Sequence, residues 1–354
     1  MTHSPITIAL DVMGGDLGPN AVIPGAALAL AARPSLRFLL VGDESVIQPA
    51  LQNHPDLARV SDIIHTTQVI SGEDKIAQAL RNGRHSSMRM AIDCVADNRA
   101  AAIVSSGNTG ALMATAKMVL KCIPGIHRPA IASQMPTQKG SRVIMLDLGA
   151  NLACDAEMLV QFAILGTVFA REIFGLDRPS VGILNVGSEE MKGHEEVRAA
   201  ASIMSQIKFP GRFHGFIEGN DIALGTVDVV VTDGFTGNVA LKTAEGIGKM
   251  AQSYMKDAFK SSPLAMFGAL FAARALKKMK DRIDPRLYNG GLMLGLNGIC
   301  VKSHGSTDAV GFSSAIIVAA DMASHGYNKR VGAAIANVMT QESFVAAQMA
   351  ATAE

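Results

Sequence analysis

The chain has 354 residues, more than the roughly 250 to 300 at which a single hydrophobic core usually stops growing, so we expect a large core or two lobes. A formal net charge of +1 gives no global electrostatic reason to bind nucleic acid, and we expect no such partner. Four dispersed cysteines, no leader-like N-terminus and no long uninterrupted apolar run favour a cytoplasmic protein without disulfides or a spanning helix.

In chain order, short apolar runs typical of strands alternate with longer segments of helical period. The strand-like runs are 6–12, 37–42, 101–106, 142–149 and 180–187, and the helical segments are 21–32, 44–53, 109–120, 157–174 and 195–207. This alternation predicts a three-layer α/β/α fold with a mostly parallel sheet. Because no linker-like tract divides the chain, residues 1–354 are expected to form one bilobal unit.

Glycine-rich loops occur at the ends of three of these runs and of a further apolar run, VDVVVTD (227–233): LDVMGGDLGPN (10–20), SSGNTG (105–110), LDLGAN (146–151) and DGFTGN (233–238). A strand-to-helix turn of this kind offers backbone N–H groups to an anion at the carboxyl end of the sheet. Neither a Walker loop nor a dinucleotide turn is present. The alternative is that the glycines only permit tight turns. The expected substrate-binding residues are Gly107, Asn108, Thr109, Gly110, Asn151, Gly234, Thr236 and Gly237.

Three aspartates, Asp11, Asp147 and Asp233, end apolar strands. A carboxylate facing an anion would repel it, so we expect these side chains to accept backbone N–H bonds and set the loops. Metal ligation is the lesser alternative, and no zinc motif is present. We expect no metal.

Residues 261–284 place a short apolar helical stretch directly before a basic one. The apolar part is too short to span a bilayer, which favours an interfacial anchor. We expect a helical hairpin over 255–287 that protrudes from the body, and the alternative is a buried or dimer-interface helix with a solvated basic end. The expected contact residues are Leu270, Phe271, Arg274, Lys277 and Lys278.

Six segments together are similar to the bacterial PlsX family: LDVMGGDLGPN, SSGNTGALMA, DLGAN, LNVGSEEMKG, DGFTGNVALK and YNGGLMLGLNGICVKSHG. The resemblance implies a homodimeric phosphate acyltransferase without a cofactor, peripherally associated with the membrane. It would convert acyl-acyl-carrier protein and inorganic phosphate to acyl phosphate for phospholipid synthesis. The implied fold resembles the isocitrate/isopropylmalate dehydrogenase and phosphotransacetylase group. The basic residues of 261–284 could then receive the acidic carrier protein, and the downstream glycerol-3-phosphate acyltransferase is a further implied partner.

With phosphate as the anion, the loops need a cation. A helix N-terminus contributes about 0.3 to 2 kcal/mol, whereas a millimolar dissociation constant takes about 4 kcal/mol. Lys192, in the polar loop of LNVGSEEMKG, is the expected cation. Asn238 can donate its amide to the substrate carbonyl. His304 can act as an acid or base, with Lys302 beside it as a binding group. The alternatives are an ordinary surface lysine, a capping asparagine and an ordinary loop histidine.

No nucleophile elbow or recognisable catalytic cysteine is present, which favours direct attack of phosphate on the thioester. Two alternatives within enzymes remain: a phosphotransacetylase acting on acyl-coenzyme A, and a decarboxylating dehydrogenase using NAD and a metal. A non-catalytic membrane-associated scaffold is the alternative from another class.

Overall fold

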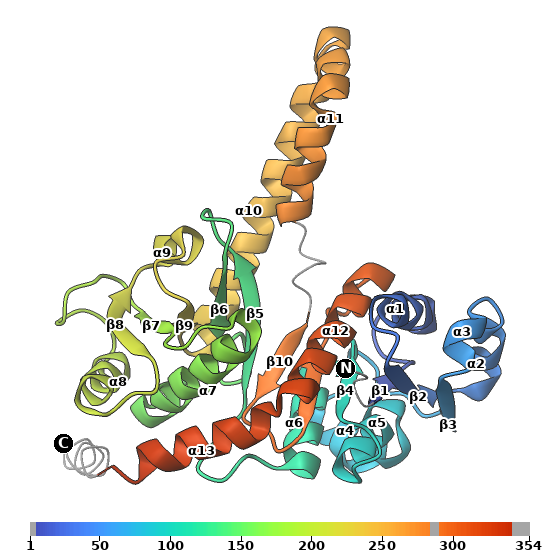
Figure 1. Ribbon diagram of the computed structural model, residues 1–354, viewed down its shortest axis with the longest axis horizontal. Helices are drawn as coiled ribbons and strands as arrows, with labels where there is room; N and C mark the ends of the chain where they lie inside the picture. The colour runs from blue at the N-terminus through green and yellow to red at the C-terminus, as the bar shows by residue number, and fades with distance from the viewer. Residues whose placement is uncertain (1–4, 284–289, 342–354) are drawn as a thin grey trace.

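The computed structural model describes residues 5–283 and 290–341, without the side chains of 278–283. Its strands form one sheet and its helices lie around it (Figure 1). The strands are β1 (Ile6–Asp11), β2 (Leu36–Gly42), β3 (Ser61–His65), β4 (Ala102–Ser105), β5 (Ala130–Pro136), β6 (Arg142–Leu146), β7 (Ser180–Leu184), β8 (Arg212–Ile217), β9 (Val229–Val231), β10 (Gly291–Leu294) and β11 (Ile299–Lys302).

The helices include one short 3-10 turn, η1 (Gly83–His85). The α-helices are α1 (Pro19–Ala32), α2 (Glu44–Leu51), α3 (Pro55–Ala58), α4 (Ile76–Asn82), α5 (Ser87–Ala96), α6 (Thr109–Leu120), α7 (Ala156–Phe174), α8 (Glu195–Gln206), α9 (Gly219–Leu224), α10 (Gly234–Lys260), α11 (Pro263–Ile283), α12 (Ala309–His325) and α13 (Tyr327–Met339).

The sheet has eleven strands in the order β3-β2-β1-β4-β11-β10-β5-β6-β9-β7-β8. Most neighbours pair in parallel; the exceptions are β10 with β11 and with β5, and β5 with β6. The mostly parallel sheet that the alternation predicts is therefore confirmed. The antiparallel strands at its middle reverse the direction, so the group from β3 to β11 and the group from β6 to β8 run opposite ways.

Side chains from the strands enter two hydrophobic cores, one on each face of the sheet. Because successive residues of a strand point to opposite faces, Ile8 and Leu10 belong to one core and Ala9 between them belongs to the other. The first core includes buried residues of α1, α7, α12 and α13, and the second includes buried residues of α5 and α6. Helices thus cover both faces, as the expected three layers require.

Helix α7 illustrates how the sequence sets an element's ends. The carboxylate of Asp155 accepts a hydrogen bond from the backbone N–H of Met158 at 2.8 Å, which caps the N-terminus. The helix ends at Gly175, which has a φ of 66° and a left-handed conformation that glycine adopts without strain. Between these caps lies a long apolar run that is buried almost throughout.

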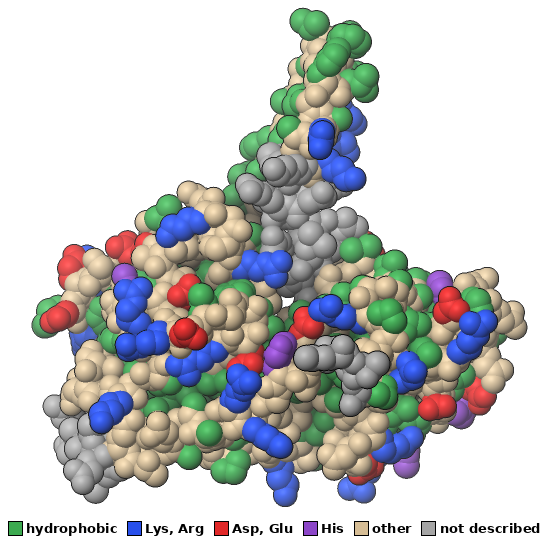
Figure 2. Space-filling model, viewed as in Figure 1, with side chains coloured by type: hydrophobic (Ala, Val, Ile, Leu, Met, Phe, Trp, Pro, Cys, Tyr) green, Lys and Arg blue, Asp and Glu red, His purple; other side chains and the backbone are tan. Residues whose placement is uncertain are grey.

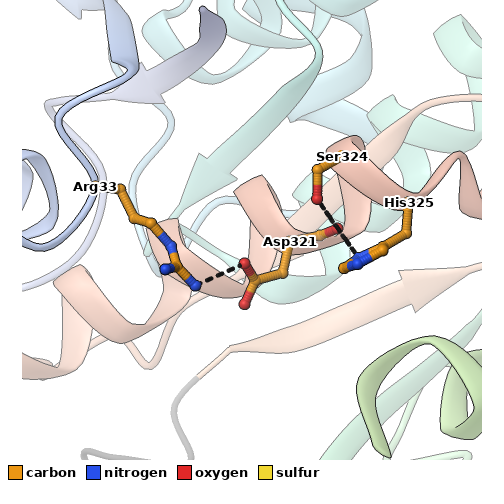
Figure 3. A network of polar contacts seen from close by, with 4 residues as sticks. All are labelled: Arg33, Asp321, Ser324 and His325. Atoms are coloured by element: carbon orange, nitrogen blue, oxygen red, sulfur yellow. Dashed lines mark hydrogen bonds and ion pairs between the residues drawn. The ribbon is translucent and has the colours of Figure 1, made fainter. Parts of the chain in front are cut away.

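Helices α1 and α12 pack against one another although they lie far apart in sequence. A Cβ at Gly25 would come within 3.0 Å of both the Ala309 carbonyl oxygen and the Phe312 Cβ, so the approach depends on glycine. At the end of the pair, Arg33 forms an ion pair with Asp321 at 3.2 Å (Figure 3). The ring of His325 lies beside Ser324 at the end of α12 (Figure 3).

Helices α10 and α11 form a hairpin that projects well away from the body (Figure 1). The pair starts at Gly234, directly after β9, and turns at 261–262. The hairpin is therefore longer than the one expected over 255–287, and residues 284–289 lie outside the described part of the chain. One helix, α10, joins the DGFTGN loop to the projecting end.

Candidate functional site

Three of the first group's strands end in a row of polar residues. The sheet register aligns Ser105 at the end of β4 with Asp11 on β1 and with Lys302 on β11. Ser105 and Asp11 are buried, and Lys302 is largely so. Because parallel strands end at one edge, residues nearly 300 positions apart in the sequence lie side by side there.

The Asp11 carboxylate ties this row to helix α5. It accepts hydrogen bonds from the hydroxyls of Ser87 and Ser105, both at 2.6 Å. Burial raises the pKa of Asp11, while these two hydroxyls and the charge of Lys302 oppose the rise. The expected loop-setting bonds to backbone N–H groups are here largely replaced by serine hydroxyls. Ser105 then accepts the N–H of Gly107 at 3.0 Å, which connects Asp11 to the SSGNTG loop.

Lys302 supplies a buried positive charge next to Asp11. Its ammonium donates to the carbonyl oxygen of Ser106 at 3.3 Å and also to that of Ser303. Burial lowers the pKa of Lys302 to about 8, against the opposing effect of Asp11 and Asp16. The lysine therefore fixes two neighbouring loops and titrates close to neutral pH.

In the SSGNTG loop, Asn108 caps α6. Its side-chain oxygen accepts the N–H of Ala111 at 3.0 Å, and its amide nitrogen donates to the Gly72 carbonyl at 2.7 Å. Both ends of the amide are thus used within the protein. Gly107 lies close to Met88: a Cβ at position 107 would be 2.6 Å from the Met88 methyl group, which would have to shift. Thr109 and Gly110 form the first turn of α6.

A second polar cluster lies where β6 and β9 end. The buried Asp147 accepts the N–H groups of Ile131 (2.9 Å), Ala150 (3.1 Å) and Asn151 (2.7 Å), and the Asn151 amide at 2.9 Å. Burial raises the pKa of Asp147, and these donors oppose the rise. Asp147 thus sets the conformation of the DLGAN loop through its carboxylate oxygens.

The N-terminus of α10 packs tightly onto this loop. A Cβ at Gly237 would lie 1.9 Å from the Asp147 carbonyl oxygen, so only glycine fits there. The N–H of Gly234 donates to the Asn151 carbonyl at 2.7 Å, and Asp233 accepts the N–H and hydroxyl of Thr236, both at 2.8 Å. The sequence predicts free N–H groups in this turn, but these two are already used inside the protein.

Asn238 lies on the exposed side of the same turn. A methyl group added to Gly149 would be 3.6 Å from the Asn238 Cβ, so the side chain stands over the DLGAN loop. The side chain is exposed, which leaves it accessible from solvent. Asn238 therefore lies beside the second cluster and does not cap the helix, a role that Asp233 fills.

Helix α10 links the two clusters, because its N-terminus packs on the second cluster and its Lys242 acts electrostatically on residues of the first. Burial first, then the charge of Lys242, lowers the pKa of His304, while Glu245 opposes that shift and Lys302 and Lys249 add to it. Lys242 also acts on Lys302. Lys242 stands one turn beyond Asn238 on the same side of α10. The candidate site thus combines the loops of both strand groups with the first turns of α10.

His304 also lies within hydrogen-bonding distance of Ser306, whose hydroxyl is 3.3 Å from its Nδ1. Because burial and nearby lysines favour the neutral ring, His304 is suited to accept a proton.

Lys192 lies further out, in the exposed loop between β7 and α8. Its ammonium pairs with Glu189 at 2.7 Å, and this carboxylate is the largest cause of the raised pKa of Lys192. The register of β9 with both β6 and β7 places this loop at the same edge as Asp147 and Asp233. Lys192 therefore lies at the edge where the second strand group ends, with Glu189 as its partner.

Sequence reasoning missed Ser87, Ser105 and Lys242. Ser105 stands within the quoted SSGNTG motif at a strand end, as Asp11 does, and that position was a usable signal. Lys242 follows Asn238 by one helical turn, which was another. Ser87 comes from α5, and no sequence spacing relates it to Asp11.

Neither thiol chemistry nor a metal cluster is suggested by the described residues. Burial raises the pKa of both Cys154 and Cys300 to about 12, which keeps them as thiols. Among residues 5–283 and 290–341, no three His, Cys, Asp or Glu side chains gather as a metal site would require. Sequence and geometry thus offer neither a thiolate nucleophile nor a metal cage in this part of the chain.

A cavity of about 440 Å³ lies elsewhere, beside the Arg33–Asp321 ion pair (Figure 3). It is lined by Arg33, Gln134, Arg142, Glu172, Ile173, Ser314, Ile317, Val318, Asp321 and His325. None of the sequence-predicted site residues is among them, so we do not assign the chemistry to this cavity.

The projecting hairpin exposes its apolar residues. Leu270 is 74% exposed and Phe271 is 79% exposed. Figure 2 shows hydrophobic side chains at the far end of the hairpin and basic side chains nearer the body. Arg274 and Lys277 are exposed, whereas the side chain of Lys278 lies outside the described residues. Within the described part of the chain, no helix has the length and hydropathy needed to span a bilayer.

Comparison with known proteins decides the family. The model of the family described as "Fatty acid synthesis protein" matches residues 6–330. The chain belongs to this family. Family relatives include the phosphate acyltransferase of Rhodospirillum centenum, 58% identical over 324 residues that cover 92% of this chain and 91% of the relative. The phosphate acyltransferase of Paramagnetospirillum magneticum is 54% identical, with 92% and 93% covered. The resemblance to the PlsX family is confirmed, and with it the expectation of an acyltransferase.

A solved structure agrees with the fold of the family. A phosphotransacetylase from Streptococcus pyogenes superposes with a TM-score of 0.64 at 18% identity, covering 90% of this chain and 94% of that one. At this identity the likeness concerns the fold alone, and it confirms the expected resemblance of fold to the phosphotransacetylase group.

Proposed function

We propose that the protein transfers a fatty acyl group from acyl-acyl-carrier protein to inorganic phosphate and releases acyl phosphate. The observation that carries the proposal is 58% identity, over nearly the whole chain, with a protein named phosphate acyltransferase. The site adds a chemical reason. Lys242, one helical turn beyond the exposed Asn238, acts electrostatically on both Lys302 and His304, and a phosphate together with a thioester carbonyl needs both cations and a neutral donor.

In the proposed reaction, a phosphate oxygen attacks the thioester carbonyl carbon directly. A carbon–oxygen bond forms and the carbon–sulfur bond breaks, with its electron pair leaving on sulfur. A thiol has a pKa near 8.5, so the thiolate leaves without strong acid assistance and is then protonated by solvent. Asn238 donates to the carbonyl oxygen as negative charge develops there. His304 accepts a proton from monoanionic phosphate.

Phosphate would be held by Lys302 from one strand group and by Lys192 from the other. Lys192 exchanges Glu189 for phosphate, which an exposed ion pair permits at little cost. The remaining N–H groups of Gly107 to Gly110 would line the phosphate site. The loops that contain Asn151, Gly234, Thr236 and Gly237 would complete its walls. Asp11, Asp147 and Asp233 hold these loops in place.

The hairpin suggests where the reaction takes place. We propose that its apolar end rests on a membrane surface and that Arg274, Lys277 and Lys278 attract anionic lipid headgroups, so that a cytoplasmic protein becomes peripherally attached. The exposure of Leu270 and Phe271 supports this, since water-exposed phenylalanine and leucine at a projecting tip mark an interaction surface. The same cations could receive the acidic carrier protein. The downstream glycerol-3-phosphate acyltransferase would then meet the product at the membrane.

The test is phosphate-dependent release of the carrier protein's thiol from palmitoyl-acyl-carrier protein, with acyl phosphate trapped by hydroxylamine. We expect release to require phosphate, to persist in excess chelator and to proceed without nicotinamide. Loss of activity in chelator, restored by a divalent ion, would overturn the proposal and favour a metal-dependent enzyme of the dehydrogenase type.

Two further arms of that assay test for a phosphotransacetylase and for a scaffold without catalysis. Faster turnover with palmitoyl-coenzyme A than with the carrier-protein thioester would favour the phosphotransacetylase. Vesicle binding without acyl transfer to phosphate from either donor would favour the non-catalytic scaffold.

A further inference from the structure

Three large apolar side chains in the two segments that meet beside Asn238 are left in solvent. Leu152 is 75% exposed, Phe235 62% and Val239 51%. We call these three residues the apolar collar. Singly exposed apolar residues are common on protein surfaces, but adjoining ones around a polar group indicate a binding surface.

The collar residues adjoin because two segments meet at the start of α10. The N–H of Gly234 donates to the carbonyl of Asn151 at 2.7 Å, which brings the segment that contains Leu152 against the start of α10, where Phe235 lies. Phe235, Asn238 and Val239 are three and four positions apart, so they share one side of the helix. Asn238 therefore lies beside Phe235 on its own helix and beside the DLGAN loop.

Packing within the chain does not account for the collar. Helix α10 contacts the body through Gly234 and Gly237, which are buried, and through Ala240 and Leu241, which pack against the second core. The collar lies on another side of the helix. Lys242 follows Asn238 by one turn of α10, and it acts electrostatically on Lys302 and His304. The surface thus changes from apolar to cationic within about one helical turn of Asn238.

We infer that the apolar collar binds the first methylenes of the substrate's acyl chain, while the thioester carbonyl lies at the Asn238 amide and phosphate lies toward the lysines. This inference rests on the proposed function and assigns its acyl specificity to Leu152, Phe235 and Val239. The reacting pair has an apolar part, the hydrocarbon chain on one side of the carbonyl, and an anionic part, the phosphate that attacks the carbonyl. The surface changes in the same order, from the apolar collar to the cationic Lys242. The occupant is therefore an aliphatic chain and not a polar acyl group.

The experiment measures kcat/KM for a series of acyl-acyl-carrier-protein donors from butyryl to hexadecanoyl, at fixed phosphate. In the unaltered protein, kcat/KM should rise by up to about fourfold for each methylene that the collar covers, and then level off. Phe235→Ser and Leu152→Ser should each lower kcat/KM for dodecanoyl donors by about tenfold or more, and for butyryl donors by less than about twofold. Phe235→Leu should keep most of the rise.

Val46→Ser is the matched control. Val46 is also an exposed apolar residue, 41% exposed, but it lies on α2 and distant in the sheet order from β6 and β9. It should leave the chain-length profile unchanged.

Each outcome bears on one conclusion. A flatter chain-length profile with short-chain activity retained supports the collar. An equal loss for every donor, an unchanged profile, or a change of oligomeric state with uniform loss would overturn it, the last because the surface would then be a subunit interface. If the unaltered protein transfers no acyl group to phosphate from any donor, the proposed function fails instead.

Discussion

Lys302 is a cation whose charge depends on pH in the range used for assays. Burial lowers the pKa of its ammonium to about 8, so the group is charged below that pH and loses its charge above it. If the charge holds phosphate, KM for phosphate should be nearly constant up to about pH 7.5 and rise about tenfold by about pH 9. Initial rates across this range, at several phosphate concentrations, measure it.

Two variants identify the titrating group. Lys302→Arg should abolish the rise in KM, because a guanidinium stays charged throughout the range. His304→Gln should retain the rise, because the pKa of His304 is already lowered and its ring is neutral there. The same rise in Lys302→Arg as in the unaltered protein would exclude Lys302 as the phosphate cation.

Asn238 and Lys192 make a separate prediction about turnover. Asn238→Ala and Lys192→Ala should each lower kcat at least about a hundredfold, the usual effect of removing a donor to a developing oxyanion or a phosphate cation. Both side chains are exposed, so the melting temperature should hardly change.

Glu189→Gln, which removes only the partner of Lys192, is the control and should retain activity. Near-normal turnover in the Asn238 or Lys192 variant would remove that residue from the site.

At this scale the sequence predicts strand-end acids well and their partners poorly. Asp147 and Asp233 are visible as aspartates that close apolar runs before glycine, and both set their loops. One of the two hydroxyl partners of Asp11 is Ser87, on a helix that no motif marks. A hydrogen bond across 76 positions depends on how α5 packs on the sheet, which local sequence does not encode.

The hairpin of α10 and α11 makes a prediction about membranes. Leu270→Glu or Phe271→Glu should reduce co-sedimentation with anionic vesicles by about tenfold or more, since each buried large side chain contributes about 1.5 to 3 kcal/mol. Turnover on soluble substrate should be retained, because both residues lie in the first half of α11, toward the projecting end of the hairpin and away from the site.

Ser253→Glu is the charge-matched control: it adds the same negative charge at about the same distance from the turn as Leu270, but at an exposed polar position of α10. If a glutamate at 270 or 271 unfolds the protein or separates subunits, the residue is structural and the membrane proposal fails.

For the hairpin, the sequence predicted the positions of the apolar and basic residues better than it predicted the lengths of the helices. The apolar stretch followed by basic residues located α11, whose helical period is visible. That α10 runs unbroken from the DGFTGN loop to Lys260 was not predicted. The two glycines Gly246 and Gly248 would weaken an isolated helix, and here α11 packs against α10 along the hairpin.

For the whole molecule, we expect a twofold dimer. Ile247, Met250 and Tyr254 are 56%, 48% and 66% exposed and form a stripe along α10, spaced by three and four residues. A hairpin that stands away from the body leaves this stripe unpaired within one chain, and a second copy can cover it. Light scattering at micromolar concentration should give twice the chain mass.

Tyr254→Lys should shift that equilibrium toward monomer, whereas Ser253→Glu, on a neighbouring side of the helix, should shift it less. A monomeric unaltered protein at the same concentration would contradict the prediction.

The architecture as a whole followed from alternating strand and helix patterns, but the strand order did not. β10 and β11 come from the end of the chain and enter the middle of the sheet, where they pair with β5 and β4. Such pairing is fixed by long-range packing of short, fully buried strands, whose uniform apolar pattern carries no register. For that reason, the split of the loops between two oppositely directed strand groups was not foreseen.

Helix α10 begins at the candidate site and ends at the projecting tip, so its 27 residues set the distance between them, about 40 Å. One acyl chain reaches across half of the hydrocarbon core, about 15 Å. With the hairpin upright on a bilayer, a newly made acyl phosphate therefore cannot touch lipid while its headgroup is still held. It must depart as a free amphiphile or be handed over by a neighbouring protein, and the length of one helix imposes that choice.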